Sequence, residues 1–141
     1  MNAAQAVSRA RPRSFLSFDF RTRRVGVAVG NTLLQSAQPL RTIASEGEAR
    51  FSAIAALLAE WKPDALIVGV PFHPDGAAHD NTRRAQRFAR QLHGRFGLAV
   101  HEVDERYTTT EALSQGAADA DAAAAALILD QFFRTLPDAD A

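Results

Sequence analysis

Apolar positions in the first third of the chain fall in short runs separated by polar corners. The runs FLSFDF and VGVAVG flank a corner rich in arginine, and each has the length and composition of a β-strand. We therefore predict strands over residues 15–20 and 25–30, joined by a hairpin turn. A third strand is predicted over residues 37–42, where Pro39 marks an edge position because proline cannot donate to a central ladder. These three strands should form an antiparallel meander.

Over residues 48–61 the apolar residues recur at helical spacing, and we predict a helix there. One arc of it collects the large apolar side chains together with one alanine: Phe51, Ile54, Ala55, Leu57, Leu58 and Trp61. The next run, ALIVGV at residues 65–70, has no polar side chain, which is typical of a parallel strand buried on both faces. The loop PFHPDG should follow at its carboxyl end.

The second half of the chain continues the alternation of helix and strand. A helix capped by Asp80 or Asn81 should end at Gly97. The elements predicted after it are a strand over residues 98–103, a short helix near residues 109–115 and a last helix over residues 120–135. This order predicts an α/β domain with a mixed sheet.

Composition limits the class of protein without identifying it. The 141 residues suit one domain, and 47% hydrophobic with 23% charged residues describes an ordinary water-soluble globule. The absence of cysteine excludes disulfides and thiolate metal sites and fits a cytoplasmic protein, and the apolar runs are too short to cross a membrane. We expect residues 14–136 to form the domain, with a disordered basic tail over 1–13 and a flexible tail over 137–141.

Arginine is concentrated in two places, although the formal net charge is zero. Residues 1–24 hold six arginines against one acid, Asp19. The helix that ends at Gly97 carries more on the arc opposite its apolar side chains: Arg83, Arg84, Arg87, Arg90 and Arg95. Arginine offers a planar fork of donors that suits phosphate. This arc is interpreted either as a solvated face or as a strip that contacts nucleic-acid phosphates.

Asp19 stands apart from the acids expected on solvated surfaces. It lies among phenylalanine and leucine in the first strand, where an ionised carboxylate is costly unless a cation or hydrogen-bond donors meet it. Strand alternation places it on the face of Phe15 and Ser17, away from Phe18 and Phe20. Asp19 is therefore either a locally stabilised acid or a functional one.

Two further acids have comparable positions. Asp121 is the first residue on the apolar face of the last helix, because apolar residues follow it at helical spacing. Asp119 is expected instead to cap that helix or to be exposed. The third acid is Asp104 or Glu105, at the end of the strand 98–103, and strand alternation does not choose between them.

Three carboxylates cannot all stay ionised in a dry pocket by themselves. Mg²⁺ or Mn²⁺ bound through their oxygens would resolve this, and such an ion can activate water and stabilise the leaving oxygen in phosphodiester cleavage. The competing interpretation is that each acid caps a helix or forms a local ion pair with Arg23, Arg24 or Arg106.

Five motifs, in order along the chain, resemble the YqgF/RuvX family: FDFRTRRVGVAVG, LIVGVPFHPDG, RRAQRFARQLHGRFG, VDERYTTTEA and DAAAAALILDQFF. Members are described as pre-16S rRNA nucleases and, earlier, as Holliday-junction resolvases. The resemblance implies an RNase H-like fold with a five-stranded mixed sheet of order 3-2-1-4-5 and helices on both faces. It also implies a catalytic metal site for Mg²⁺ or Mn²⁺ at Asp19, Glu105 and Asp121, with Asp104 adjacent.

Two departures from the family pattern bear on activity. The family usually has DFGT where this chain has Asp19-Phe20-Arg21-Thr22, and an arginine in the left-handed conformation open to glycine would cost about 1 kcal/mol. Arg21 is expected to pair with Asp19 in competition with a metal, or to hold a substrate phosphate. The second departure is the short segment LSQGAADA before Asp121, where the family has a longer and often basic one.

The resemblance implies a metal-dependent endonuclease with a two-metal carboxylate mechanism, acting on structured RNA such as pre-rRNA or on branched DNA, as a monomer or homodimer. The alternative is a binding or scaffold protein on the same fold with a weakened site; an actin-like ATPase would need a longer chain and a glycine where Arg21 stands. The residues expected to contact nucleic acid are Arg21, Arg23, Arg24, Arg83, Arg84, Arg87, Arg106, Thr108 and Thr109.

Overall fold

A five-stranded mixed sheet organises the molecule, in a computed structural model that describes residues 12–107 and 119–136. The strand order is β3-β2-β1-β4-β5, as predicted. The strands are β1 (Ser14–Phe20), β2 (Val25–Asn31), β3 (Ser36–Ile43), β4 (Ala65–Val70) and β5 (Ala99–Asp104). β1, β2 and β3 form the expected antiparallel meander, while β4 runs parallel to both β1 and β5. The carboxyl ends of β1, β4 and β5 therefore lie at the same edge of the sheet.

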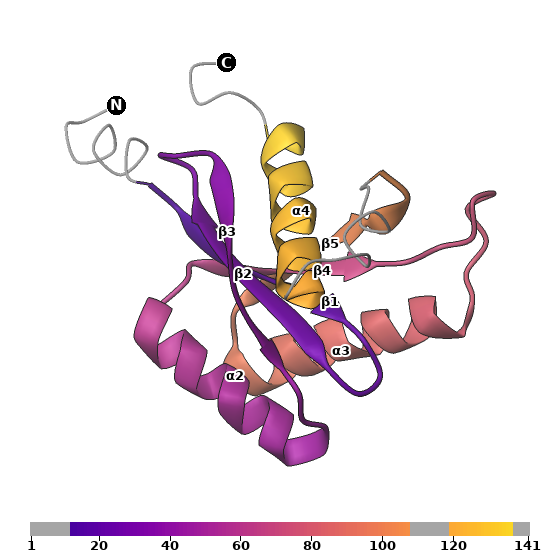
Figure 1. Cartoon of the computed structure of the whole chain (residues 1–141), viewed down its shortest axis with the longest axis horizontal. Coiled ribbons are helices and arrows are strands. Elements are labelled where there is room, and N and C mark those ends of the chain that lie inside the picture. Colours follow the sequence, from indigo (N-terminus) through magenta and orange to yellow (C-terminus); the bar gives the residue numbers. More distant parts are fainter. Residues whose placement is uncertain (1–11, 108–118, 137–141) are drawn as a thin grey trace.

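Helices cover both faces of this sheet (Figure 1), which confirms the predicted architecture. The helices α2 (Gly47–Trp61) and α3 (Asp80–Phe96) lie on one face, and α4 (Ala120–Thr135) lies on the other. A 3₁₀ turn, η1 (Glu105–Tyr107), follows β5 directly. No helix in the described part of the chain is long and apolar enough to span a membrane.

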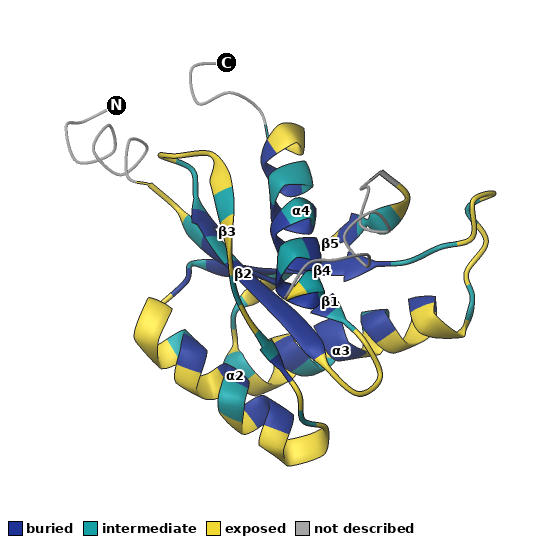
Figure 2. Ribbon diagram, in the orientation of Figure 1, coloured by how far each residue is buried: buried dark blue, intermediate teal, exposed yellow. Residues whose placement is uncertain are grey.

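Strand alternation in β1 divides the core into two layers, visible as buried segments on both faces in Figure 2. Leu16 and Phe18 belong to the layer beneath α2 and α3, where Phe18 meets Phe88 edge to face at 5.8 Å between ring centroids. Phe15 lies in the opposite layer with the apolar side chains of α4. The Ser17 hydroxyl donates to the Ala125 carbonyl of α4 at 2.7 Å. Asp19 shares this second face, as alternation predicts.

The predicted apolar arc of α2 is partly wrong. Ala55 is exposed and Trp61 is 41% exposed, whereas Arg50 is buried. Its guanidinium donates to three backbone carbonyls, those of Ser45, Arg21 and Thr22. Helical spacing does not identify such a residue, because its burial depends on carbonyls of a distant turn.

The expected cap of α3 is also corrected. The helix begins at Asp80, but its N-cap is His79. The His79 Nδ1 accepts from the Asn81 amide at 3.2 Å, and the Thr82 hydroxyl accepts from the His79 amide at 3.0 Å. This reciprocal pair satisfies the amides of His79 and Asn81 at the start of the helix, which therefore begins at least one residue earlier than predicted.

Several predictions concern residues outside those that the structure describes. They are the short helix near residues 109–115, the segment LSQGAADA up to residue 118, Thr108 and Thr109, and the two tails except for Pro12 and Arg13. The predicted last helix, residues 120–135, coincides with α4.

Candidate active site

Asp19 lies between two glycines near the carboxyl end of β1. It is paired with Gly26 on β2 and Gly69 on β4, and its residue is 2% exposed. A Cβ atom on Gly26 would lie 1.9 Å from the backbone oxygen of Asp121, and one on Gly69 would lie 2.6 Å from Oε1 of Glu105. The absence of a side chain at these two glycines leaves room for the Asp121 backbone and the Glu105 carboxyl group beside Asp19.

Glu105 forms a hydrogen bond with Asp19. It begins η1, one residue beyond β5, so its side chain is directed over Gly69 of the neighbouring strand. Burial, followed by the charge and hydrogen bond of Asp19, raises the pKa of Glu105 to about 8. Burial also raises the pKa of Asp19, with Arg21 and Glu105 acting against it. At neutral pH one proton is therefore shared by the two carboxyl groups.

Asp121 lies in the first turn of α4 and is buried against the sheet. Its carboxylate pairs with Nε of Arg24. Asp119, the N-cap residue of the same helix, is exposed and accepts from the Thr42 hydroxyl instead. The inward position of Asp121 and the outward position of Asp119 are as predicted.

The hairpin turn between β1 and β2 brings two arginines to the acids. The Arg21 Nε lies 3.3 Å from Oδ2 of Asp19, while Arg24 pairs with Asp121. The turn is closed by the Arg21 amide, which donates to the Arg24 carbonyl at 2.9 Å. Arg21 does not have a positive φ, so the backbone strain expected from its replacing a glycine is absent, while its predicted pairing with Asp19 is present.

Asp104, the alternative to Glu105, faces Arg106. Its Oδ1 accepts from the Arg106 amide at 2.9 Å, and its Oδ2 accepts from Nη2 at 2.8 Å. Burial acts to raise the pKa of Asp104, but the hydrogen bonds and charge of Arg106 outweigh it and lower the pKa. Of the two adjacent acids, Glu105 is the one that meets Asp19.

Residues 13–135 match the family RuvX, described as Holliday junction resolvase. A protein of Albidiferax ferrireducens is 68% identical over 123 residues, which cover 87% of this chain and 79% of the relative. One of Polaromonas sp. is 64% identical over 124 residues, covering 88% of this chain and 90% of the relative. Both are named "Putative pre-16S rRNA nuclease". The chain belongs to the RuvX family.

The fold agrees with that membership. RuvC of Thermus thermophilus, solved in complex with a Holliday junction substrate, matches with a TM-score of 0.52 at 14% identity, covering 86% of this chain and 93% of RuvC. At that identity the match shows the fold alone. It confirms the RNase H-like architecture expected from the resemblance, within a family of nucleases.

The arginines predicted to contact nucleic acid in this RuvX chain fall into three groups. Arg21 and Arg24 pair with the acids, and Arg23 is exposed in the same turn. On α3, the exposed arc carries three of them: Arg83, which pairs with Asp80 at 3.1 Å, Arg84 and Arg87. Arg106 is bonded to Asp104, as the competing interpretation has it.

The oxygen donors of this candidate site suit a hard divalent cation, although they are not arranged to coordinate one together. In residues 12–107 and 119–136 no three carboxylate, imidazole or thiol groups are spaced to hold a single ion. The acids are all oxygen donors, which Mg²⁺ and Mn²⁺ prefer. The raised pKa values of Glu105 and Asp19 indicate that burial disfavours two negative charges here, which a bound cation would relieve.

Three residues of the site were not identified from the sequence. Gly26 and Gly69 lie in runs that already have strand composition, so nothing local marks them as spacers. Arg50 lies one turn into a helix whose other charged residues are solvated. The two glycines could be identified only by their positions opposite Asp19, and those positions are known only once the pairing of β1 with β2 and β4 is known.

Proposed function

We propose that this protein is a metal-dependent endonuclease that hydrolyses phosphodiester bonds in structured nucleic acid. The observation that carries the proposal is the buried Asp19 beside Gly26 and Gly69, with Glu105 bonded to it and Asp121 close enough for its charge to act on it. These three acids would hold Mg²⁺ or Mn²⁺, which when bound activates water and stabilises the leaving oxygen. A location in the cytoplasm accords with such a role.

The protein's own residues supply the remaining requirements of cleavage. Arg21 and Arg24 neutralise the acids in the absence of substrate, and each is about half exposed, so each is able to turn to a phosphate. Arg23 in the same turn, and Thr108 and Thr109 beyond η1, are the further contacts we propose near the scissile phosphate. Arginine binds phosphate through two parallel N–H donors.

The exposed arc of α3 is proposed as the path of the nucleic-acid backbone away from the acids. Arg83, Arg84 and Arg87 lie in the first half of this helix, which follows the loop at the carboxyl end of β4. Replacing any one with glutamine should weaken binding to every sequence alike and reduce the slope of log affinity against log salt by about one.

Pre-16S rRNA is the substrate we favour, because the relatives of Albidiferax ferrireducens and Polaromonas sp. carry that name. Branched DNA is the second candidate, from the description of the family as Holliday junction resolvase. Pre-rRNA fragments and four-way junctions, assayed side by side with Mn²⁺, separate the two. Cleavage of the junction alone would overturn the choice of RNA.

Asp19→Asn is the decisive variant for the nuclease proposal. Because the substituted amide would be a neutral and weaker ligand than the carboxylate, we expect cleavage to fall at least a hundredfold. Asp130→Asn is the matched control, since Asp130 accepts from the Ala37 amide away from the acids and an asparagine retains an acceptor. Equal cleavage by wild type and Asp19→Asn protein would overturn the assignment.

The pairing of Arg21 and Arg24 with the acids also favours a second candidate, a scaffold protein that binds nucleic acid without cutting it. Calorimetric titration with Mn²⁺ distinguishes the two functions. Binding that is lost in Asp19→Asn supports the nuclease, and absence of binding supports the scaffold. Activity that appears only in Arg21→Gly would show that the native arginine blocks the site.

A further inference from the structure

Asp104 and Arg106 form a compact unit around the 3₁₀ turn η1. Besides the amide and Nη2 contacts, the Arg106 Nε donates to Oδ2 of Asp104 at 3.0 Å. Asp104 therefore accepts from both the backbone and the side chain of the residue two positions later. These bonds fix the turn whose first residue is Glu105.

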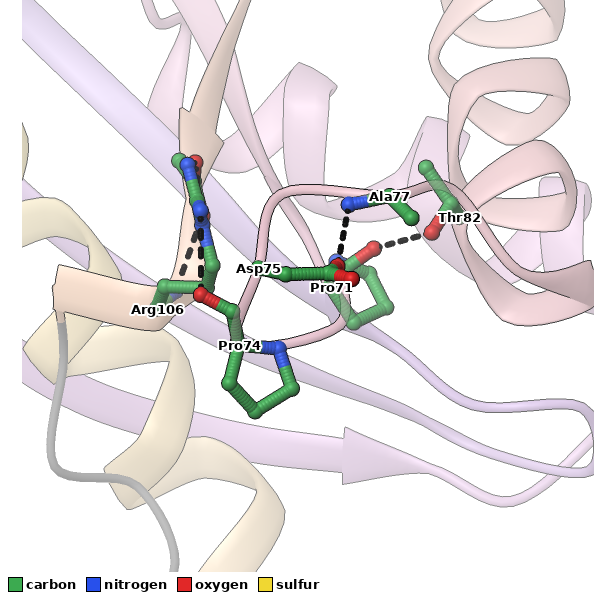
Figure 3. Close-up of polar contacts among 7 residues, drawn as sticks. Pro71, Pro74, Asp75, Ala77, Thr82 and Arg106 are labelled. Atoms are coloured by element: carbon green, nitrogen blue, oxygen red, sulfur yellow. Dashed lines mark hydrogen bonds and ion pairs between the residues drawn. The ribbon is translucent and has the colours of Figure 1, made fainter.

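The Arg106 guanidinium also reaches the loop that joins β4 to α3, residues 71–79 (Figure 3). Its Nη1 donates to the Pro74 carbonyl at 3.4 Å, and its Cζ atom lies 5.8 Å from the centroid of the Phe72 ring. A Cβ atom on Gly76 would lie 3.1 Å from Nη1. Since Gly76 has a φ of +93°, the loop turns at this residue and passes directly beside the guanidinium.

The loop is itself closed by hydrogen bonds, so one anchor holds it as a unit. The His73 amide donates to the Ala77 carbonyl at 2.9 Å, and the Gly76 amide donates to the His73 carbonyl at 2.8 Å. The Asp75 carboxylate accepts from the Ala77 amide at 2.8 Å (Figure 3). At the far end, the Thr82 hydroxyl donates to the Pro71 carbonyl, which ties the loop to α3.

Two consecutive side chains thus contact two glycines of one continuous segment. Glu105 lies against Gly69, near the end of β4, and Arg106 lies against Gly76 in the following loop. A shift of η1 moves both contacts together. The turn η1 therefore joins the contact of Glu105 with β4 to the contact of Arg106 with the loop.

We propose that Asp104 and Arg106 are positioning residues: their ion pair fixes the loop 71–79 and the Glu105 carboxyl group in place beside Asp19. The loop so held forms one wall of the nucleic-acid site. This inference rests on the proposed function for its catalytic consequence, but the loop anchor itself is measurable without cleavage. It assigns Arg106 to the protein's own loop and not to a substrate phosphate, and Asp104 to Arg106 and not to a metal.

The test compares Arg106→Gln and Asp104→Asn with wild type, and uses Arg134→Gln as the matched control. Arg134 is an exposed arginine bonded to Gln131 near the other end of α4. Amide hydrogen exchange at His73 and Gly76 reports the loop, because both amides are hydrogen-bonded within it. Mn²⁺ affinity, kcat, KM and the salt dependence of RNA binding complete the measurements.

We expect exchange at His73 and Gly76 to rise at least tenfold in both variants and to stay unchanged in Arg134→Gln. Mn²⁺ affinity should fall by the same factor in the two variants, since each loosens Glu105 without removing a ligand. The loss of kcat/KM should be about tenfold and mainly in kcat, with the salt slope of binding unchanged.

Three results would overturn the proposal. Unchanged exchange in Arg106→Gln, with a salt slope reduced by about one, identifies a phosphate ligand. Weaker Mn²⁺ binding in Asp104→Asn alone identifies Asp104 as a metal ligand. A loss confined to KM shows that Glu105 is not affected. If wild type cuts none of the RNA or DNA substrates, the proposed function fails, whereas matched changes in exchange and Mn²⁺ affinity still support the anchor.

Discussion

Two segments border the acids at the carboxyl edge of the sheet, and each is held by one arginine through backbone carbonyls. The hairpin turn 21–24 is held by Arg50, which donates to the carbonyls of Arg21 and Thr22 at 3.3 and 3.0 Å. The loop 71–79 is held by Arg106 through the Pro74 carbonyl. The anchors differ in burial and in partner: Arg50 is buried among carbonyls, and Arg106 is part-exposed and paired with Asp104.

This difference sets how firmly each border is fixed. Burial lowers the pKa of Arg50, yet arginine stays charged in proteins, so its guanidinium holds three carbonyls at once through charge-assisted hydrogen bonds. Arg106 lies close enough to water for its partners to be solvated when it moves. The hairpin turn should therefore be a rigid border that presents Arg21 and Arg24, and the loop a border that yields locally.

Gly26→Ala should give the largest loss of stability on the hairpin side. The added methyl group would meet the backbone of Asp121, which cannot move without α4, so we expect a cost of about 3 kcal/mol. Gly76→Ala on the loop side meets only the end of Arg106 and a strained φ, with a cost of about 1 kcal/mol. Urea unfolding measures both, and equal costs would remove the distinction between the two borders.

Arg50→Met should be the next most severe change. It leaves three part-buried carbonyls without their guanidinium donor, which costs about 1–3 kcal/mol. Arg106→Gln removes a part-exposed ion pair and should cost about 1 kcal/mol or less. Chemical denaturation of the two variants beside Arg134→Gln checks this order, and a larger loss for Arg106→Gln would reverse our interpretation of the anchors.

The pH dependence of stability tests the acids that both segments border. Folded Glu105 keeps its proton to about pH 8, whereas in the unfolded chain it releases it near the ordinary pKa of 4.5. Because the folded state binds more protons between these values, the free energy of unfolding should fall as pH rises from about 4.5 to about 8.

Glu105→Gln removes this titration and serves as the comparison. Without divalent metal, the fall in the free energy of unfolding across that window should be smaller in Glu105→Gln than in wild type. The free energy of unfolding is measured by urea unfolding at several pH values. If it changes with pH equally in the two proteins, Glu105 does not have the raised pKa from which the shared proton is inferred.

The sequence alone determined the order of strands and helices and the inward positions of Asp19 and Asp121. These follow from local periodicity: alternation in a strand and 3.6-residue spacing in a helix state which side chains share a face. The errors concern the α2 arc, where Ala55 and Trp61 are exposed and Arg50 is buried, and the α3 cap. Arg50 and His79 were missed because their roles depend on hydrogen bonds that periodicity does not describe.

Only the tertiary structure decided which groups meet at the site. Asp104 and Glu105 are adjacent, and alternation does not distinguish them; the choice depends on the parallel pairing of β4 and β5 and on the space above Gly69. Arg24 and Asp121 are separated by 97 positions. Periodicity tells which face a residue occupies but not the distance to a residue on another element, and ion pairing, proton sharing and metal binding all depend on that distance.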